Sequence, residues 1–219
     1  MVKRRAAARK VAARSAAAAV ERDVPPAAAI RRAAFDLFAR QGFNITTVRD
    51  IMHACGLTQG ALYNHFASKD ELLAALIIHT QDELERLLLD AVEKAGDDPV
   101  DQLFAYARAY AMRHTRNRVE ALVANREFAW LEHTKLVQVR SSRRRVREIL
   151  INLLKKAAKA KAIRLPTSGG KEEVKMTAMA ILNMCTDLAY YYAPGGAWSD
   201  EAVADLHAKM ALRIVGVER

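Results

Sequence analysis

The chain has 219 residues, of which 52% are hydrophobic and 27% charged, and its net charge is +10. That length accommodates one small domain and a second domain with its own core. It contains no run of about 18 apolar residues, which argues against a transmembrane helix, and its basic, Ala-rich start lacks the apolar stretch of a secretory signal.

Residues 1–24 are predicted to form a basic, flexible arm. Residues 1–22 carry seven Lys and Arg side chains against the single acid Glu21, and they offer almost nothing to pack. A disordered or partly helical arm of this charge suits non-specific attraction to nucleic-acid phosphates and entry into a minor groove. A solvated tail or a misassigned start is the alternative interpretation.

Helices are predicted near 27–41, 47–55, 58–65 and 68–94. In the second of them Thr46 or Thr47 is placed to cap the N-terminus, with Asp50 in the first turn. Apolar residues at i, i+3, i+4 and i+7 form one face, namely Val48, Ile51, Met52 and Cys55. Gly56 ends this helix, because a left-handed backbone is needed there.

The third predicted helix, 58–65, differs in its outward face. Thr58 is placed to cap it, and Ala61, Leu62 and Phe66 point inward. The residues left outside are Gln59, Gly60, Tyr63, Asn64 and His65. Gly60 costs about 1 kcal/mol against Ala inside a helix, which suggests close approach of another surface.

Two short helices joined by a glycine turn form a helix-turn-helix, whose second helix is shaped for the DNA major groove. We therefore expect the exposed face of 58–65 to read DNA, with Thr47 and Lys69 placed near phosphates. A helix-turn-helix used only for packing is the alternative.

This stretch resembles the tetracycline-repressor (TetR) family of bacterial regulators. The match runs from Ile30 through Thr47-Val-Arg-Asp-Ile and Cys55-Gly-Leu-Thr-Gln-Gly-Ala-Leu-Tyr-Asn-His-Phe to Lys69-Asp-Glu-Leu-Leu. It implies an all-α fold, with a three-helix DNA-binding domain at 25–75 and a six-helix ligand-binding and dimerisation domain at 76–219. It also implies a homodimeric, cytoplasmic transcriptional regulator, most often a repressor, that binds an inverted-repeat operator.

Further helices are predicted near 99–115, 117–132, 134–162, 171–192 and 199–215, separated by Gly- and Pro-containing breaks at 96–99, 166–170 and 194–196. Cys55 and Cys185 lie on apolar faces in different domains. We interpret them as buried thiols rather than a disulfide, which fits a reducing cytoplasm.

Residues 113–164 hold fifteen Lys and Arg side chains against four acids. Arg126 and Arg143 fall on otherwise apolar helical stripes, where a guanidinium needs an anionic partner. One interpretation is a pocket for an anionic effector, with walls from Phe104, Tyr110, Trp130 and Leu150. The alternatives are neutralisation by Glu127 or Asp187, or extension of both side chains to solvent. The remaining arginines of 134–162 are expected on a solvated face or near phosphates: Arg140, Arg144, Arg145 and Arg147.

The end of helix 171–192 resembles TetR-family members that sense acyl-CoA thioesters. Here Tyr191-Tyr192-Ala193-Pro194 replaces the usual Trp-Tyr-Arg-Pro, so the basic residue is missing. Packing of Tyr190–Tyr192 at a dimer interface is the alternative. The last helix offers a face for a four-helix dimer interface with helix 171–192: Val203, Leu206, Met210 and Ile214.

These observations predict a repressor released by a small amphipathic effector, such as an acyl-CoA or a fatty acid. A cationic, drug-like effector held by Asp187 and Tyr191 is one alternative, and a DNA-binding protein without ligand control is another. An enzyme is not expected, because the six histidines are scattered without a nucleophile or acid–base partner. We expect no cofactor and no metal, since no Cys/His cluster, P-loop or Rossmann glycine pattern is present.

Overall fold

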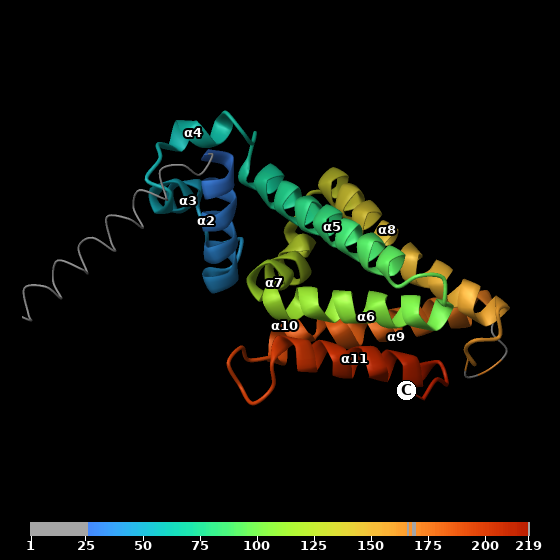
Figure 1. Ribbon diagram of the computed structural model, residues 1–219. Helices are drawn as coiled ribbons and strands as arrows, with labels where there is room; N and C mark the ends of the chain where they lie inside the picture. Colours follow the sequence, from blue (N-terminus) through green and yellow to red (C-terminus); the bar gives the residue numbers. More distant parts are fainter. Residues whose placement is uncertain (1–25, 166, 168–169, 219) are drawn as a thin grey trace, which may run out of the picture.

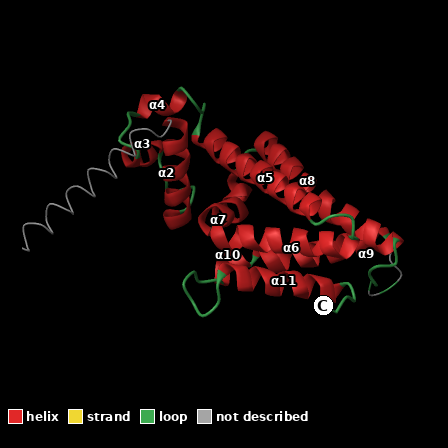
Figure 2. Ribbon diagram, viewed as in Figure 1, coloured by secondary structure: helices red, strands yellow, loops and turns green. Residues whose placement is uncertain are grey.

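The computed structural model describes residues 26–165, 167 and 170–218. The expected basic arm at 1–24 and part of the expected break at 166–170 lie outside the described residues. Within them the ordered elements are helices, and there is no strand (Figure 2). They are α2 (Pro26–Gln41), α3 (Val48–Ala54), α4 (Gln59–Tyr63), α5 (Lys69–Lys94), α6 (Pro99–Arg116), α7 (Arg118–Arg126), the 3₁₀ helix η2 (Glu127–Trp130), α8 (His133–Lys159), α9 (Lys171–Thr186), α10 (Leu188–Tyr191) and α11 (Asp200–Ile214). The expected all-α fold is confirmed.

Helices α2, α3 and α4 gather at one end of the molecule, which we call the head (Figure 1). Each contributes fully buried apolar side chains to one core, among them Ile30, Phe38, Ile51 and Leu62. Leu72 at the start of α5 closes this core from the other side. In α3 and α4 the buried Ile51, Met52 and Leu62 belong to the predicted apolar faces, whose members Val48, Cys55 and Ala61 are half-buried.

Helices α5 to α11 form the body. Figure 1 shows α5 and α8 as two long helices side by side, with α6, α9 and α11 packed beneath them. Their core includes the fully buried Leu103, Tyr106, Leu150 and Leu154. The Tyr106 hydroxyl donates a hydrogen bond to the Val146 carbonyl at 3.0 Å, which satisfies the one polar group of that ring.

The head and the body share apolar contacts. Val123 and Ala124 of α7, together with Val139 of α8, belong to the same buried cluster as Ile30 and Phe38 of α2. The head therefore packs against α7 and the start of α8. Because the shared core is close-packed, a displacement of either helix must also move side chains of the head core.

Two predicted helices are divided. The expected helix 117–132 ends as α7 at Arg126 and continues as the tighter 3₁₀ turn η2. The expected helix 171–192 is interrupted at Asp187, between α9 and α10. Ser68 and Ser199 cap α5 and α11, since each hydroxyl accepts a backbone N–H three residues on. Cys55 and Cys185 are free thiols, half-buried and buried respectively. No helix of the described ranges is both long enough and apolar enough to cross a bilayer.

Candidate functional site

The first helix of the helix-turn-helix begins with a reciprocal cap. The Thr47 hydroxyl accepts the Asp50 N–H at 3.1 Å, and the Asp50 carboxylate accepts the Thr47 N–H at 2.9 Å. The carboxylate also accepts the Thr47 hydroxyl at 2.7 Å, and the two hydrogen bonds that Thr47 donates to it lower the pKa of Asp50, because both favour its ionised form. Thr47 is thus the predicted N-cap. Its exposed hydroxyl, expected near a phosphate, is already engaged with Asp50.

Gly56 makes the turn between α3 and α4. Its φ of +67° lies in the left-handed region, as the sequence predicts. The Leu57 N–H then returns to the Met52 carbonyl at 2.9 Å, which closes the end of α3. Thr58 stands at the N-cap position of α4, but its side chain makes no capping bond. That hydroxyl is exposed and free to meet another molecule.

The outward face of α4 is polar and exposed. Leu62 is fully buried beneath it, and the Tyr63 side chain is 60% exposed. All five residues predicted for this face are exposed: Gln59, Gly60, Tyr63, Asn64 and His65. A Cβ added at Gly60 would meet nothing within 4 Å, so the fold itself does not demand glycine there. Donors, acceptors and one glycine on a protruding helix are the features of a surface that reads base edges at close range.

Lys69 lies differently from the prediction. Its Nζ donates to the carbonyls of Phe43 at 2.7 Å and Thr46 at 2.8 Å, and it stands 4.1 Å from the centre of the Phe43 ring. Desolvation lowers the pKa of this ammonium. Lys69 therefore ties α5 to the loop between α2 and α3. The sequence prediction of a phosphate contact overlooked these two carbonyls, which come from residues more than twenty positions away.

This head matches known DNA-binding proteins. The family model described as "Bacterial regulatory proteins, tetR family" matches residues 30–76, and that described as "Tetracyclin repressor-like, C-terminal domain" matches residues 96–215. The chain belongs to the TetR family. TetR-family proteins are transcriptional regulators, and the resemblance seen in residues 55–66 is confirmed.

Curated relatives agree with this assignment. An HTH-type transcriptional repressor of Mycobacterium tuberculosis is 41% identical over 76 residues, which are 32% of this chain and only 40% of that protein. The transcriptional repressor KstR2 of Rhodococcus jostii is 24% identical over 192 residues, 82% of this chain and 85% of KstR2.

Solved structures are similar over most of the chain. A TetR-family regulatory protein from Rhodococcus RHA1 has a TM-score of 0.81 at 24% identity, covering 90% of this chain and all of that one. AibR in complex with isovaleryl coenzyme A and operator DNA has a TM-score of 0.76 at 25% identity, covering 86% of this chain and 98% of AibR.

Some of the predicted effector residues come together in the body of this TetR-family chain. Leu150 is fully buried, and Phe104 and Tyr110 are partly buried against the same core. The Tyr110 hydroxyl is 3.1 Å from the Thr186 hydroxyl, and burial raises the pKa of Tyr110 to about 12. The Tyr110 ring stacks on His114, with centroids 4.5 Å apart. Phe104, Tyr110 and His114 belong to α6, whereas Leu150 reaches the same core from α8.

Arg143 is held at the inner side of α8. Its guanidinium donates to the Ala124 carbonyl and to Asn125 Oδ1 at 3.4 Å, and it lies 4.2 Å from the Phe128 ring centre. Desolvation lowers the pKa of Arg143. The Asn125 Nδ2 atom is buried without a hydrogen-bond partner. The guanidinium thus rests on a carbonyl, an amide and a ring, and none of these carries a full negative charge.

Other predicted effector residues lie on the outside. Trp130 and Tyr191 are 56% and 62% exposed, and Asp187 is exposed as well. Trp130 faces outward because η2 is a 3₁₀ turn, in which the side-chain directions of an α-helical stripe do not continue. Arg126 is half-exposed and stands 3.8 Å from Glu127, so the alternative of a Glu127 counter-ion describes its position.

The remaining arginines of α8 are not all solvated. Arg145 pairs with Asp82 at 2.5 Å and Glu85 at 2.8 Å on α5, and Arg144 pairs with Glu148 at 3.8 Å. The Arg147 Nε atom is buried without a partner. Arg145 therefore joins the two long helices of the body, which periodicity within α8 alone could not predict.

The expected dimer face is also rearranged in part. Leu206 and Met210 of α11 are exposed, whereas Val203 is buried within the chain. Tyr192 is buried, and its hydroxyl donates to Asp200 Oδ1 at 2.6 Å; the exposed Tyr191 instead meets His207 Nε2 at 2.9 Å. Of the three tyrosines, Tyr190 and Tyr191 remain available to a partner.

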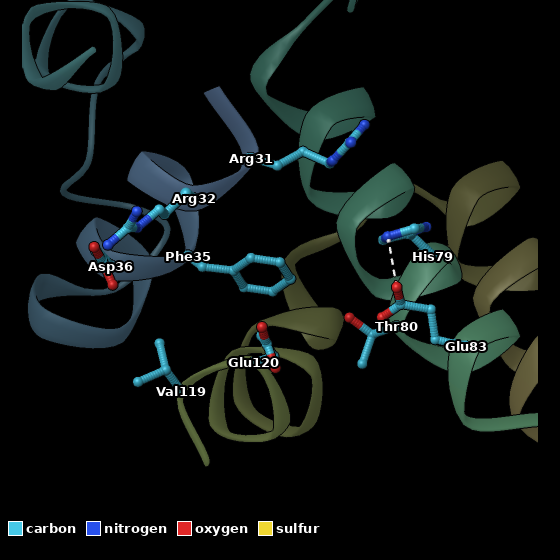
Figure 3. Close-up of a pocket in the computed structure, with 9 residues that line it drawn as sticks. All are labelled: Arg31, Arg32, Phe35, Asp36, His79, Thr80, Glu83, Val119 and Glu120. Carbon is cyan, nitrogen blue, oxygen red and sulfur yellow. Dashed lines mark ion pairs between the residues drawn. The ribbon is translucent and has the colours of Figure 1, made fainter. Parts of the chain in front are cut away.

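A cleft that the sequence did not predict lies between the head and the body. It has a volume of about 410 Å³. Figure 3 shows Phe35 reaching from α2 toward Glu120 of α7, with His79 and Glu83 of α5 paired at 3.3 Å behind it. Its walls come from α2, α5 and the region of α7, so α2 is not packed tightly against the body along its whole length.

Proposed function

We propose that this TetR-family chain is a ligand-released repressor that binds an inverted-repeat operator as a homodimer. The exposed polar face of α4, with a glycine that the fold does not require, is the observation that carries the proposal. The Mycobacterium tuberculosis and Rhodococcus jostii relatives described above are repressors, and AibR was solved with operator DNA. Each α4 would enter one major groove, and the two-fold symmetry of the dimer would match that of the operator.

In this proposal each of the three parts of the chain has the role that the sequence predicts. Residues 25–75 read the operator, residues 76–219 hold the effector and the partner subunit, and residues 1–24 add attraction to phosphates. Such a regulator acts in the cytoplasm, where the bacterial chromosome lies, and it needs neither a catalytic residue nor a cofactor.

The effector we propose is a small amphipathic anion, such as an acyl-CoA or a fatty acid. Arg143 supplies a half-buried cation that donates to a carbonyl and an amide and not to a carboxylate, and Asn125 Nδ2 supplies an unused donor beside it. Phe104 and Leu150 would form the apolar walls of the effector site. The AibR structure contains isovaleryl coenzyme A, which places an acyl-CoA in a protein of the same fold.

Selection of genomic fragments by the purified protein tests the operator assignment. Bound fragments should share an inverted repeat whose half-sites lie about one helical turn apart, and footprinting should protect both halves. Fragments without a common sequence would contradict a sequence-specific repressor.

Thermal stabilisation in the absence of DNA tests the effector class. Fatty acids and acyl-CoAs should raise the melting temperature, and Arg143→Met should weaken that binding by more than tenfold, because methionine keeps bulk but removes the charge. Arg140→Met, at an exposed position of the same helix, is the matched control and should bind as the wild type does. Stabilisation by cationic compounds alone would contradict the anionic effector and favour a site at Asp187 and Tyr191.

A further inference from the structure

Residues 124–128, at the end of α7 and the start of η2, stand between α8 and the head. We call them the junction segment. On the body side, Arg143 alone contacts three of the five: it donates to the Ala124 carbonyl and the Asn125 side chain, and it covers the Phe128 ring. One cation of α8 thus contacts both the end of α7 and the start of η2.

On the head side, the junction segment ends in a buried carboxylate. The Glu127 side chain is only 5% exposed, and its Oε2 accepts the Phe43 N–H at 3.2 Å. Phe43 lies in the loop between α2 and α3, and Lys69 holds the carbonyls of the same loop. This loop leads directly into the Thr47 cap of α3. Glu127 thus fixes where the helix-turn-helix begins relative to the body.

Apolar contacts make the connection stiff, while a cleft leaves room for movement. Ala124 is buried in the same cluster as Phe38 of α2, so a displacement of the segment is felt directly in the head core. Along α2, α5 and α7, however, the 410 Å³ cleft separates the head from the body (Figure 3). The head can tilt into this space without first expelling packed side chains.

We propose that Glu127 is a positioning residue for DNA binding, and that Arg143 controls it through the junction segment. The proposal deepens the proposed function: an anion that engages Arg143 and Asn125 Nδ2 would draw the guanidinium away from the Ala124 carbonyl. The segment would then shift, Phe43 would lose its acceptor, and α3 and α4 would leave the spacing that the operator requires. The effector thereby gains different affinities for the two states, as allosteric release requires.

The relay is testable on the full-length protein without any effector, by residue-resolved hydrogen exchange. Glu127→Met should speed exchange of the Phe43 amide roughly tenfold or more, the effect expected when a hydrogen bond to a charged group is lost. Glu127→Gln keeps an acceptor and should remain near the wild-type rate. Arg143→Met should also speed the Phe43 amide, because it frees the segment that carries Glu127.

The matched control is Arg145→Met, two residues along α8, where the guanidinium pairs with α5 instead. It should leave the Phe43 amide unchanged. The amide of Tyr106, in the middle of α6, is the internal reference and should keep its rate in every variant. Equal acceleration of Phe43 and Tyr106 in Arg143→Met would mean general loosening and would overturn the relay.

A double variant tests whether Arg143 and Glu127 act on the Phe43 amide through the same connection. If Arg143 acts through Glu127, the Arg143→Met and Glu127→Met effects on the Phe43 amide should not multiply in the double variant. A wild-type Phe43 rate in Arg143→Met, or fully multiplied effects, would overturn the relay. Neither result would touch the effector proposal, which depends on ligand stabilisation measured without DNA.

Discussion

Gly60 occupies the first turn of α4, the short helix that presents the exposed polar face. The backbone at this position needs no special conformation, and a Cβ would stand in open space. Glycine also costs a helix about 1 kcal/mol against alanine. Its neighbours on the same face, Gln59 and Tyr63, are exposed as well. We therefore propose that glycine at this position allows close approach of DNA.

Gly60→Ala should therefore separate stability from function. The variant should raise the free energy of unfolding by up to about 1 kcal/mol while weakening operator binding, because the added methyl group stands between the helix and the groove. Thermal melts and operator titrations measure the two effects. Gly56→Ala is the control: its φ of +67° strains alanine, so it should lower stability instead. Wild-type operator affinity in Gly60→Ala would refute the close approach.

Gln59→Ala should relax sequence preference. An amide side chain can bond a base edge with about 1–3 kcal/mol of discrimination, and Gln59 projects from the first turn of α4. Affinity should fall for the operator and remain nearly constant for random DNA in parallel titrations. Equal losses on both DNAs would contradict the assignment of Gln59 to base reading.

Lys69→Met should weaken binding to every DNA sequence, in contrast to Gln59→Ala, which should weaken binding to the operator alone. Because the ammonium is used by the Phe43 and Thr46 carbonyls, its removal loosens the head and should weaken all DNAs alike. The salt dependence of binding should stay unchanged, whereas loss of a phosphate contact would flatten the slope by about one unit. Titrations at several salt concentrations distinguish the two roles.

At the scale of elements, helical periodicity predicted much of the architecture. The buried residues Ile51 and Met52 of α3 follow from the predicted apolar spacing, and the end of α3 at Gly56 follows from the need for a left-handed backbone. Those properties depend on residues a few positions apart, which one sequence displays directly.

Partners between distant elements could not be predicted in this way. Glu127 accepts from Phe43 across 84 positions, and Arg145 finds Asp82 on another helix. The 3₁₀ turn η2 also redirects Trp130 outward, although its spacing matches an α-helical stripe. In each case tertiary packing decides the outcome, and periodicity within one helix carries no information about it.

Buried His114 on α6 gives the body a pH-dependent stability. Its Nδ1–H donates to the Tyr110 carbonyl at 2.8 Å, and desolvation lowers the His114 pKa from 6.5 to about 4. Between about pH 6.5 and pH 4, His114 is therefore protonated in the unfolded chain and neutral in the folded chain. Stability should fall as the pH drops from about 6.5 toward 4, by up to about 3 kcal/mol from this residue.

His114→Asn retains a donor near the position of Nδ1 but cannot titrate. Denaturant unfolding at a series of pH values should show a shallower loss of stability between about pH 6.5 and 4 than in the wild type. His53→Gln, at an exposed site, is the control and should keep the wild-type slope. Parallel slopes in His114→Asn and the wild type would show that His114 is not the group responsible.

At the scale of the whole molecule, exposed apolar side chains lie on both α9 and α11 in the described part of the chain. Met176 is 65% exposed on α9, and Leu206 and Met210 are exposed one helical turn apart on α11. Apolar side chains gathered on two adjacent helices are expected at a subunit interface. We propose that the homodimer typical of the TetR family buries this surface of α9 and α11 against its symmetry copy, so that the spacing of the two heads depends on how the bodies meet.

Introducing charge on this surface should therefore dissociate the dimer and weaken operator binding, although each head keeps its fold. The variant Leu206→Glu/Met210→Glu places two like charges opposite their symmetry copies, which an isologous interface brings together. Analytical ultracentrifugation should show a monomer, and operator affinity should fall by more than tenfold, because one head contacts only half of the inverted repeat. Leu89→Glu makes the same change at a half-exposed leucine of α5 and should leave the dimer and the operator affinity unchanged. A double variant that stays dimeric would place the interface elsewhere. A monomeric double variant with full operator affinity would instead show that one head suffices, and that the dimer does not set the spacing of the heads.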